Sequence, residues 1–438
     1  MKISSPVNRA SATARKHQRR LFEIGSALLY EIVLVISMAV IFPITTRALG
    51  PGGYGEYTTI FVIAGLAITW AFASGGAAIV QLVLQADRDL TSLAQTGRRQ
   101  VVLLVLPFSG LGTAAVVALF GTDVLVPALL IIGVDLLVAG LAEVHLAILF
   151  AVRGVTPVVR IRSIGPIVRT LGVVGLALFG DVTLLGLAVV NLPGTLLMLA
   201  VATATARPIM EQSQTLRKPL TTGRELARYT SMYGAAISAN NVQDSGEKIV
   251  LAAYRPAVEV GEYQAAYRLV QLALMPVRAL EAVAIRWFLP ADPRPDAQVS
   301  RALRLSVPVG VYGLACIPVI VLARPALGLV VGEDFELALE ILLWLSAFPL
   351  VRSLGDIPTM GLLGLGRNAI RMWLGIGTAA LSMVFYFSLV PSFGWRGAVV
   401  GTYLSEFAML AASWWMLIRY QRRADQGRQH VGPDTGAA

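Results

Sequence analysis

Apolar runs of 20 residues or more alternate with short polar segments along most of the chain. They occupy residues 25–46, 58–82, 101–120, 125–150, 161–180, 183–204, 229–253, 263–287, 303–323, 335–358, 369–391 and 396–418. An α-helix needs about 20 residues to cross a hydrocarbon core of about 30 Å. The pattern therefore predicts an all-α integral membrane protein with about 12 transmembrane helices. The fifth run is a weaker candidate because it contains Arg162, Pro166 and Arg169, and the seventh is unusually polar.

Composition supports the same class of protein. Of the 438 residues, 56% are hydrophobic and 14% are charged, whereas an ordinary soluble domain has about 25% charged residues. The basic segment ARKHQRR precedes the first run, which is longer than the apolar part of a secretory signal and lacks a small-residue cleavage site. We therefore expect the first run to be a retained span.

Basic residues predict the orientation, because they gather in alternate loops and in both tails. One set of loops holds Arg88, Arg98, Arg99, Arg153, Arg160, Arg207, Arg217, Lys218, Arg224, Arg228, Arg294, Arg301, Arg367 and Arg371. The other loops hold little beyond Arg47, Arg255, Arg324 and Arg396. Since short cytoplasmic loops carry the excess of lysine and arginine, both termini are predicted to be cytoplasmic. This distribution also explains the net charge of +10 without a nucleic-acid partner.

Short motifs recur in the same order in the two halves of the chain. Gly-Glu-Tyr occurs at 55–57 and again at 261–263, an offset of 206 (261 − 55). Further matches join Gly121 to Gly332 (332 − 121 = 211), and Gly154 to Gly366 (366 − 154 = 212). Collinear matches at nearly constant offset indicate an internal repeat of six helices. An even number of spans gives both copies one orientation, so we expect two parallel six-helix bundles with substrate at their interface.

The repeat also predicts the domain boundaries. We expect a basic cytoplasmic tail at 1–24, an N-terminal bundle at 25–206, a cytoplasmic linker at 207–228, a C-terminal bundle at 229–418 and a polar cytoplasmic tail at 419–438.

Two neighbouring predicted spans carry polar side chains along one helical arc. The seventh has Thr230, Tyr233, Asn240, Asn241, Asp244 and Lys248, and the eighth has Gln264, Arg268, Gln271 and Arg278, with Glu281 at its edge. A charged residue at mid-membrane costs at least about 2.5 kcal/mol, so such residues are normally functional or paired. A hydrated cavity would explain both stripes. The alternative is that Asp244 neutralises Lys248, and Arg278 neutralises Glu281, at helical spacing.

The stripes provide the candidate binding residues. Substrate contacts are expected from Arg268, Gln271, Arg278, Asn240, Asn241 and Lys248, since guanidinium groups bind phosphate oxygens bidentately. Asp135 and Asp244 are candidates for ion coupling, with H⁺ and Na⁺ both open; Asp135 could instead be a buried, neutral, hydrogen-bonded acid. Arg162 and Arg169 could receive a headgroup from the cytoplasm, or could simply extend toward the interface.

Several enzyme and metal motifs are absent from the sequence. The chain has no GxxxxGK[ST] loop, no HExxH motif, only three histidines and one cysteine, Cys316. Nothing nominates a catalytic residue, a metal ligand or an organic cofactor. We therefore do not expect an enzyme.

Two long segments resemble a known family. TTRALGPGGYGEYTTIFVIAGL is similar to the first hairpin of the bacterial polysaccharide (O-antigen and exopolysaccharide) flippases. The segment from NNVQDSGEKIV to AIRWFLP resembles the start of that family's second half, and VGEDFELALEILLWLSA a later element. The family belongs to the superfamily of multidrug, oligosaccharidyl-lipid and polysaccharide exporters. The resemblance implies alternating-access transport of a polyprenyl-diphosphate-linked oligosaccharide across the bacterial cytoplasmic membrane. It also implies membrane lipids and a polysaccharide polymerase as partners.

Other functions predict different features. A multidrug or cation antiporter of the same superfamily would favour acidic and aromatic cavity residues over the arginines of the eighth span. A lipid II flippase typically has two further helices beyond the twelve found here. A membrane-embedded polymerase or glycosyltransferase would need large loops, and every loop here is short.

Overall fold

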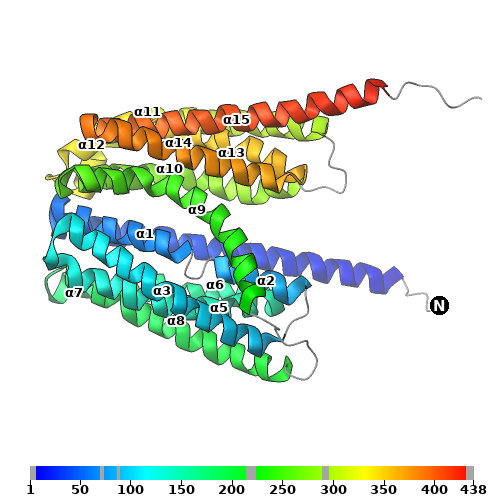
Figure 1. Cartoon of the computed structure of the whole chain (residues 1–438), viewed down its shortest axis with the longest axis horizontal. Helices are drawn as coiled ribbons and strands as arrows, with labels where there is room; N and C mark the ends of the chain where they lie inside the picture. The colour runs from blue at the N-terminus through cyan, green and yellow to red at the C-terminus, as the bar shows by residue number, and fades with distance from the viewer. Residues whose placement is uncertain (1–5, 70–73, 86–88, 214–222, 289–294, 431–438) are drawn as a thin grey trace, which may run out of the picture. The chain divides into compact units, whose positions relative to one another are not determined.

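The computed structural model describes residues 6–69, 74–85, 89–213, 223–288 and 295–430, and within these ranges it contains helices and no strands (Figure 1). The first half contains α1 (Pro6–Ile68), α2 (Ser74–Gln85), α3 (Leu90–Phe120), α4 (Leu125–Ala128), α5 (Leu136–Arg153), α6 (Val155–Arg162), α7 (Ile164–Phe179) and α8 (Leu184–Ser213). A 3₁₀ turn at Thr122–Val124 precedes α4, and a π-helical segment at Leu129–Asp135 joins α4 to α5.

The second half contains α9 (Gly223–Tyr254), α10 (Ala257–Phe288), α11 (Pro295–Val331), α12 (Glu336–Leu345), α13 (Phe348–Gly364), α14 (Asn368–Phe393) and α15 (Trp395–His430). The predicted all-α class is confirmed. Each of the twelve predicted runs corresponds to one helix or to a broken helix, and residues 70–73 of the second run lie outside the described residues.

Among the described residues, seven helices are long and apolar enough to cross a membrane, and α12 with α13 forms an eighth candidate bent by 41°. The long helices α9, α10 and α15 do not meet this criterion, and α9 and α10 carry the predicted polar stripes. At α9 and α10, the sequence therefore predicts transmembrane spans that the hydropathy of the helices alone does not identify. Polar residues within a membrane bundle are tolerated where they face water or a partner rather than lipid.

Contacts divide the chain into two compact units. Unit 1 comprises Met1–Leu49 and Ile63–Ile237, and unit 2 comprises Gly50–Val62 and Ser238–Ala438. The division inside α1 coincides with a kink, because Gly50 has φ +63° and ψ 178°. Part of the predicted linker, residues 214–222, lies outside the described residues.

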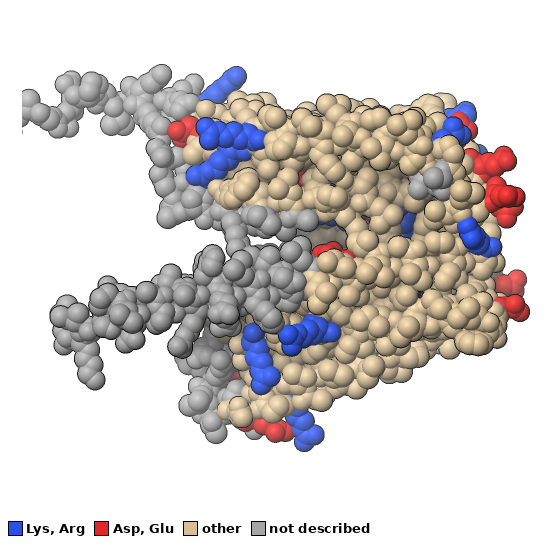
Figure 2. Space-filling view, turned by 180° about the vertical axis from the view of Figure 1, so that it is seen from behind, with Lys and Arg blue, Asp and Glu red and all other residues tan. Residues whose placement is uncertain are grey.

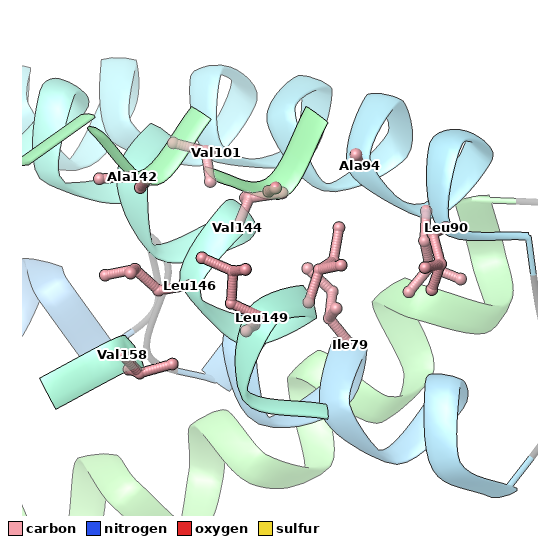
Figure 3. Packing of buried hydrophobic residues seen from close by; sticks show 14 of the residues in the cluster. Ile79, Leu90, Ala94, Val101, Ala142, Val144, Leu146, Leu149 and Val158 are labelled. Carbon is pink, nitrogen blue, oxygen red and sulfur yellow. The ribbon is translucent and has the colours of Figure 1, made fainter. Parts of the chain in front are cut away.

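The core of unit 1 is built from small and branched side chains. Ile79 of α2, Leu90 and Ala94 of α3, and Val144 and Leu149 of α5 pack in one buried cluster (Figure 3). Unit 2 has its own cluster, in which Phe288 of α10, Leu305 of α11, Ile357 of α13 and Leu417 of α15 are buried. Each unit thus buries an apolar core of its own.

Large apolar side chains are also exposed at helical spacing on the outside of each unit. Leu103, Leu106 and Leu111 of α3 in unit 1, and Val311 and Leu322 of α11 in unit 2, are mostly exposed. On the face shown in Figure 2, charged side chains lie mainly toward the helix ends, and the surface between them is largely uncharged. Exposed apolar surface on this scale suits lipid rather than water.

Matched glycines of the predicted repeat share an unusual backbone conformation. Gly121 and Gly332 have φ +91° and +114°, and Gly154 and Gly366 have φ +83° and +69°. Only glycine adopts positive φ without steric cost. The sequence matches therefore mark equivalent turns in the two halves, which supports the repeat at the level of the backbone.

The repeated Gly-Glu-Tyr motif forms a close contact inside unit 2. A Cβ added to Gly55 would lie 2.9 Å from the backbone nitrogen of Gly261, and one added to Gly261 would lie 2.9 Å from that of Gly55. The same two Cβ atoms would clash with the carbonyl oxygens of Ala257 and Pro51, respectively. The contact is reciprocal at the repeat offset, since 257 − 51 and 261 − 55 both equal 206. Glycine is needed here for close approach of two helices.

The glutamate of the second motif copy has a structural role. Glu262 is buried, and its Oε2 accepts a hydrogen bond of 2.6 Å from the backbone nitrogen of Ala338, in the first turn of α12. An acid at this place satisfies a helix N-terminus and its positive dipole end. The motif therefore supports both the α10 contact and the start of α12.

Candidate functional site

A cluster of charged side chains lies inside unit 2 around Arg352 of α13. Its guanidinium contacts Asp244 of α9 (Nη2–Oδ1 2.9 Å), Glu406 of α15 (Nη1–Oε1 2.5 Å) and Asp356 one turn further along α13 (Nε–Oδ2 3.5 Å). Three carboxylates from three helices thus share one cation. We call these four residues the Arg352 cluster.

Neutral polar groups extend the cluster toward α14. The Gln243 amide nitrogen donates to Glu406 Oε1 at 3.3 Å, and the Thr378 hydroxyl donates to Gln243 Oε1 at 3.4 Å. Gln243 and Glu406 are buried, while the side chains of Asp244 and Asp356 are 35% and 37% exposed. The cluster is therefore buried at Glu406 and partly exposed at its two aspartates.

Lys248 lies one turn after Asp244 on α9 and has a different partner from the one considered in the sequence. Its ammonium is 3.1 Å from Glu247 Oε1 and 3.8 Å from the centre of the Tyr267 ring, and it donates to the backbone carbonyl of Asp244. The carboxylate of Asp244 pairs with Arg352 instead. The alternative in which Asp244 and Lys248 simply neutralise each other is therefore wrong.

The charges of this region do not balance. Asp356 also interacts electrostatically with Arg278 and Arg371, and Glu281 with Arg352 and Arg278. The region therefore contains four cations, Arg352, Lys248, Arg278 and Arg371, and five carboxylates, those of Asp244, Asp356, Glu406, Glu247 and Glu281, so the formal sum is 4 − 5 = −1. Uncompensated charge in a low-dielectric interior is costly and is relieved by taking up a proton or a cation. The described residues contain no group of three or more His, Cys, Asp or Glu arranged to hold a metal ion.

The candidate residues of α10 lie in several environments. The guanidinium of Arg268 lies close enough to the hydroxyl of Tyr54, which is buried in unit 2, to interact with it electrostatically. Arg278 is exposed and Gln271 is partly buried. Glu281 is partly buried, and its Oε1 has no hydrogen-bond partner.

The two predicted asparagines are placed only in part. Asn241 is partly buried on α9. The side chain of Asn240 lies outside the described residues. The structure therefore brings Asp244 and Lys248 into one region with Arg352, places Arg268 against Tyr54, and leaves the roles of the remaining candidates as predictions.

Asp135, the candidate of unit 1, ends the π-helical segment before α5. Its carboxylate oxygens accept hydrogen bonds from Asn191 Nδ2 at 3.0 Å and from Thr195 Oγ1 at 2.5 Å, both on α8. Such π-helical insertions are rare and frequently occur at functional sites. Two neutral donors suit either a buried structural acid or a site that exchanges a proton, so both interpretations of Asp135 stay open.

Four of the residues that build the charged region were missed by the sequence analysis: Arg352, Asp356, Glu406 and Glu247. Arg352 and Asp356 lie four residues apart within the predicted span 335–358, and Glu406 lies within 396–418. The rule that nominated Asp135, a charge at membrane depth, applied equally to these residues. Arg352, Asp356 and Glu406 lie on helices other than those of the two polar stripes, and Glu247 lies on α9 beside Lys248.

Comparison with known proteins identified one family and several solved structures of similar fold. A family model described as "Polysaccharide biosynthesis protein" matches residues 23–285, more than half of the chain. A comparison with curated proteins found no match.

The solved structures that resemble the chain are membrane transporters and flippases. An inward-facing multidrug resistance MATE family transporter of the MOP superfamily has TM-score 0.71 and 13% identity, covering 88% of this chain and 96% of its own. The lipid II flippase MurJ, in an inward closed conformation, has TM-score 0.66 and 13% identity, covering 89% and 87%. A MOP superfamily transporter from Pyrococcus furiosus, described as having a binding pocket of reverse polarity, has TM-score 0.60 and 14% identity, covering 90% and 94%. The fold is therefore that of the MOP superfamily.

Proposed function

Because the chain belongs to the polysaccharide biosynthesis protein family, we propose that it moves a lipid-linked oligosaccharide across the bacterial cytoplasmic membrane by alternating access. The cargo is a polyprenyl-diphosphate-linked glycan destined for the cell surface, and the termini are cytoplasmic. In this role the chain is a transporter rather than an enzyme, and it acts beside membrane lipids and a polysaccharide polymerase.

The observation that carries this proposal is a set of three basic side chains within the predicted spans of α9 and α10, which lie almost wholly inside the matched region. They are Lys248 on α9, and Arg268 and Arg278 on α10, and seven other helices of the described residues are apolar enough to cross a membrane. A sugar diphosphate cannot cross hydrocarbon without polar partners. Arginine binds phosphate oxygens while keeping its charge. We assign the substrate contacts to Arg268, Gln271, Arg278, Asn240, Asn241 and Lys248.

We assign ion coupling to Asp244 within the Arg352 cluster, with Asp135 as a second candidate. The excess of carboxylates supports this role, and partial exposure of Asp244 and Asp356 gives an ion access. The coupling ion is H⁺ in our proposal, because a proton is taken up by one carboxylate without the several ligands that Na⁺ requires. If transport instead requires Na⁺, the coupling ion is Na⁺, and the proposed site at Asp244 is the same.

Reconstitution tests the proposed cargo. The full chain in liposomes that contain a fluorescent polyprenyl-diphosphate oligosaccharide should raise the fraction of probe reached by an impermeant quencher from outside. Empty liposomes are the control. The alternative, a multidrug or cation antiporter, is favoured by the MATE fold alone. It predicts no such rise, but extrusion of a lipophilic cation from vesicles under an imposed ion gradient. No rise in the quenched fraction of the oligosaccharide probe, together with extrusion of the cation, would exclude the proposal.

A further inference from the structure

A cavity of about 360 Å³ lies inside unit 1, and its lining includes none of the residues assigned above. Gly76, Ala77 and Val80 of α2 form one wall, and Leu146 of α5 and Val158 of α6 form others. Leu146 and Val158 are among the buried side chains labelled in Figure 3. Ligand pockets in proteins have volumes of about 300–1,000 Å³ and mostly apolar walls with a few polar groups. This cavity has both properties.

The polar group of the cavity is an ion pair between Glu143 of α5 and Arg162 of α6. Arg162 Nε donates to Glu143 Oε1 at 3.0 Å, and its Nη2 donates to Oε2 at 2.5 Å. The Arg162 side chain is 42% exposed and that of Glu143 17%. The phenol of Tyr30 on α1 is close enough to interact electrostatically with both charges. The guanidinium therefore uses one edge on glutamate and keeps its remaining surface accessible.

The position of this pair along the chain is informative. Arg162 follows Arg153 and Arg160 of a loop predicted to be cytoplasmic, and it stands at the start of the fifth apolar run. A partly exposed ion pair contributes little to stability. A contribution to stability therefore does not by itself explain why a glutamate occurs at position 143 and an arginine at position 162. A guanidinium at the inner edge of the membrane, beside an apolar pocket, suits a ligand with an anionic head and an apolar body.

We propose that this cavity binds the phosphate of a lipid headgroup, with Arg162 exchanging the carboxylate of Glu143 for phosphate oxygens. Glu143 holds the guanidinium in the bidentate geometry that phosphate also requires. The small residues Gly76 and Ala77 leave room for the head, and Val80, Leu146 and Phe150 contact the adjoining apolar part. Binding at this cavity does not require the transport function proposed above.

Exchange of partners predicts opposite effects for the two members of the pair. Arg162→Ala removes the phosphate ligand, so binding should weaken about tenfold, the loss expected for a charge-assisted hydrogen bond. Glu143→Gln removes the competing carboxylate, so binding should be unchanged or tighter. Ala77→Leu fills the cavity without altering charge and should weaken binding as Arg162→Ala does. A purely structural ion pair would instead make both charge variants less stable and would change lipid binding equally in the two variants, or in neither.

Native mass spectrometry of the full-length protein in detergent measures this directly, with two probes added separately: farnesyl diphosphate and phosphatidylglycerol. Loss of binding in Arg162→Ala with retention in Glu143→Gln supports the site. The probe that shows this pattern identifies the source as a prenyl diphosphate or a membrane phospholipid. The matched control is the exposed pair Arg207–Glu211 on α8, joined at 2.8 Å but outside the cavity. Arg207→Ala should not change binding of either probe.

Two results would overturn the proposal. One is binding of both probes by Arg162→Ala and Ala77→Leu at the wild-type affinity, with the proteins folded as judged by thermal unfolding. The other is equal weakening by Arg162→Ala and Glu143→Gln, which would mean that the ion pair only maintains local structure. Neither result bears on glycan transport, which the liposome measurement tests separately.

Discussion

Arg352 shows how one residue can organise charges from several helices. Its side chain is 18% exposed, and its guanidinium contacts carboxylates on α9, α13 and α15. Removing one member of a buried ion pair costs more than the pair itself contributes, because the remaining charges lose their partner. Arg352 should therefore be more sensitive to substitution than the arginines at the surface.

The first prediction concerns the stability of this cluster. Arg352→Gln should destabilise the purified protein by about 3–5 kcal/mol, because three carboxylates are left together without their cation. Adding Glu406→Gln should restore part of the loss, since one of the unpaired charges is then neutral. Thermal unfolding in detergent, followed by tryptophan fluorescence, measures both variants. Arg396→Gln is the control, since its pair with Glu340 is exposed and 3.4 Å long. Equal effects at Arg352 and Arg396 would show that the cluster is not a coupled unit.

The second prediction concerns the cargo. Arg268→Ala and Arg278→Ala should each abolish surface glycan while the protein remains in the membrane at normal abundance, because each removes a phosphate contact. Lysine should restore export only in part, since bidentate geometry is lost. Arg268 also interacts with Tyr54. Tyr54→Phe is therefore the matched variant: it removes the hydroxyl that faces Arg268 but keeps the cation, and it should export glycan. Wild-type export from the double alanine variant would contradict the assignment.

At the scale of the elements, the repeated turn determines how closely α1 and α10 approach within unit 2. The contact is made by backbone atoms of Gly55 and Gly261, and each glycine faces the turn that precedes the other. Such an approach is available only where neither residue has a Cβ. The motif therefore recurs because both partners of a reciprocal contact have the same steric requirement.

The third prediction follows from that contact. Gly55→Ala and Gly261→Ala should each destabilise the protein by at least about 1–3 kcal/mol, the usual cost of overpacking, because the new Cβ meets backbone that cannot rotate away. Gly65→Ala on the same helix is the control, since nothing lies within 4 Å of its added Cβ. Thermal unfolding of the three purified variants provides the measurement. A Gly65 variant as unstable as the other two would point to helix flexibility rather than the contact.

At the scale of the whole molecule, the chain is a multi-pass helical membrane protein whose two units have separate cores. Its fold resembles MOP superfamily structures at 13–14% identity. A fold shared at such low identity is consistent with the tolerance of packed cores for changes among apolar residues of similar total volume. The arrangement is a scaffold, and function depends on the few polar residues placed within it.

The fourth prediction concerns the topology of the chain. The distribution of lysine and arginine predicts cytoplasmic termini and twelve spans. Reporter fusions at Asp181 and Asp334, which lie between helices, should be external, and a fusion at Gln95 should be internal. An alkaline phosphatase and fluorescent protein pair distinguishes the two sides. A cytoplasmic Asp334 would remove one span from the second half and exclude two repeats of equal orientation.

Sequence and structure agree best where the physical signal is local. Apolar length alone predicted the helices, and the positive-φ glycines at 121, 154, 332 and 366 were already visible as matched positions of the repeat. The polar stripes of α9 and α10 were also evident, because helical spacing makes neighbours of residues along one helix. In each case the information lies within a few turns of the chain.

Tertiary structure decided the partners of the charges. Sequence spacing suggested that Asp244 and Lys248 could pair, yet Asp244 pairs with Arg352 on α13, and Lys248 with its neighbour Glu247. Likewise, Glu143 and Arg162 lie 19 residues apart and form an ion pair in the lining of a cavity, which no sequence pattern predicts. Helical periodicity specifies which residues share a face, whereas the faces that meet depend on packing between helices distant in sequence. The sequence alone therefore determined which helices carry charged residues and at which positions. Only the packing of the helices determined which charged residues form ion pairs with one another.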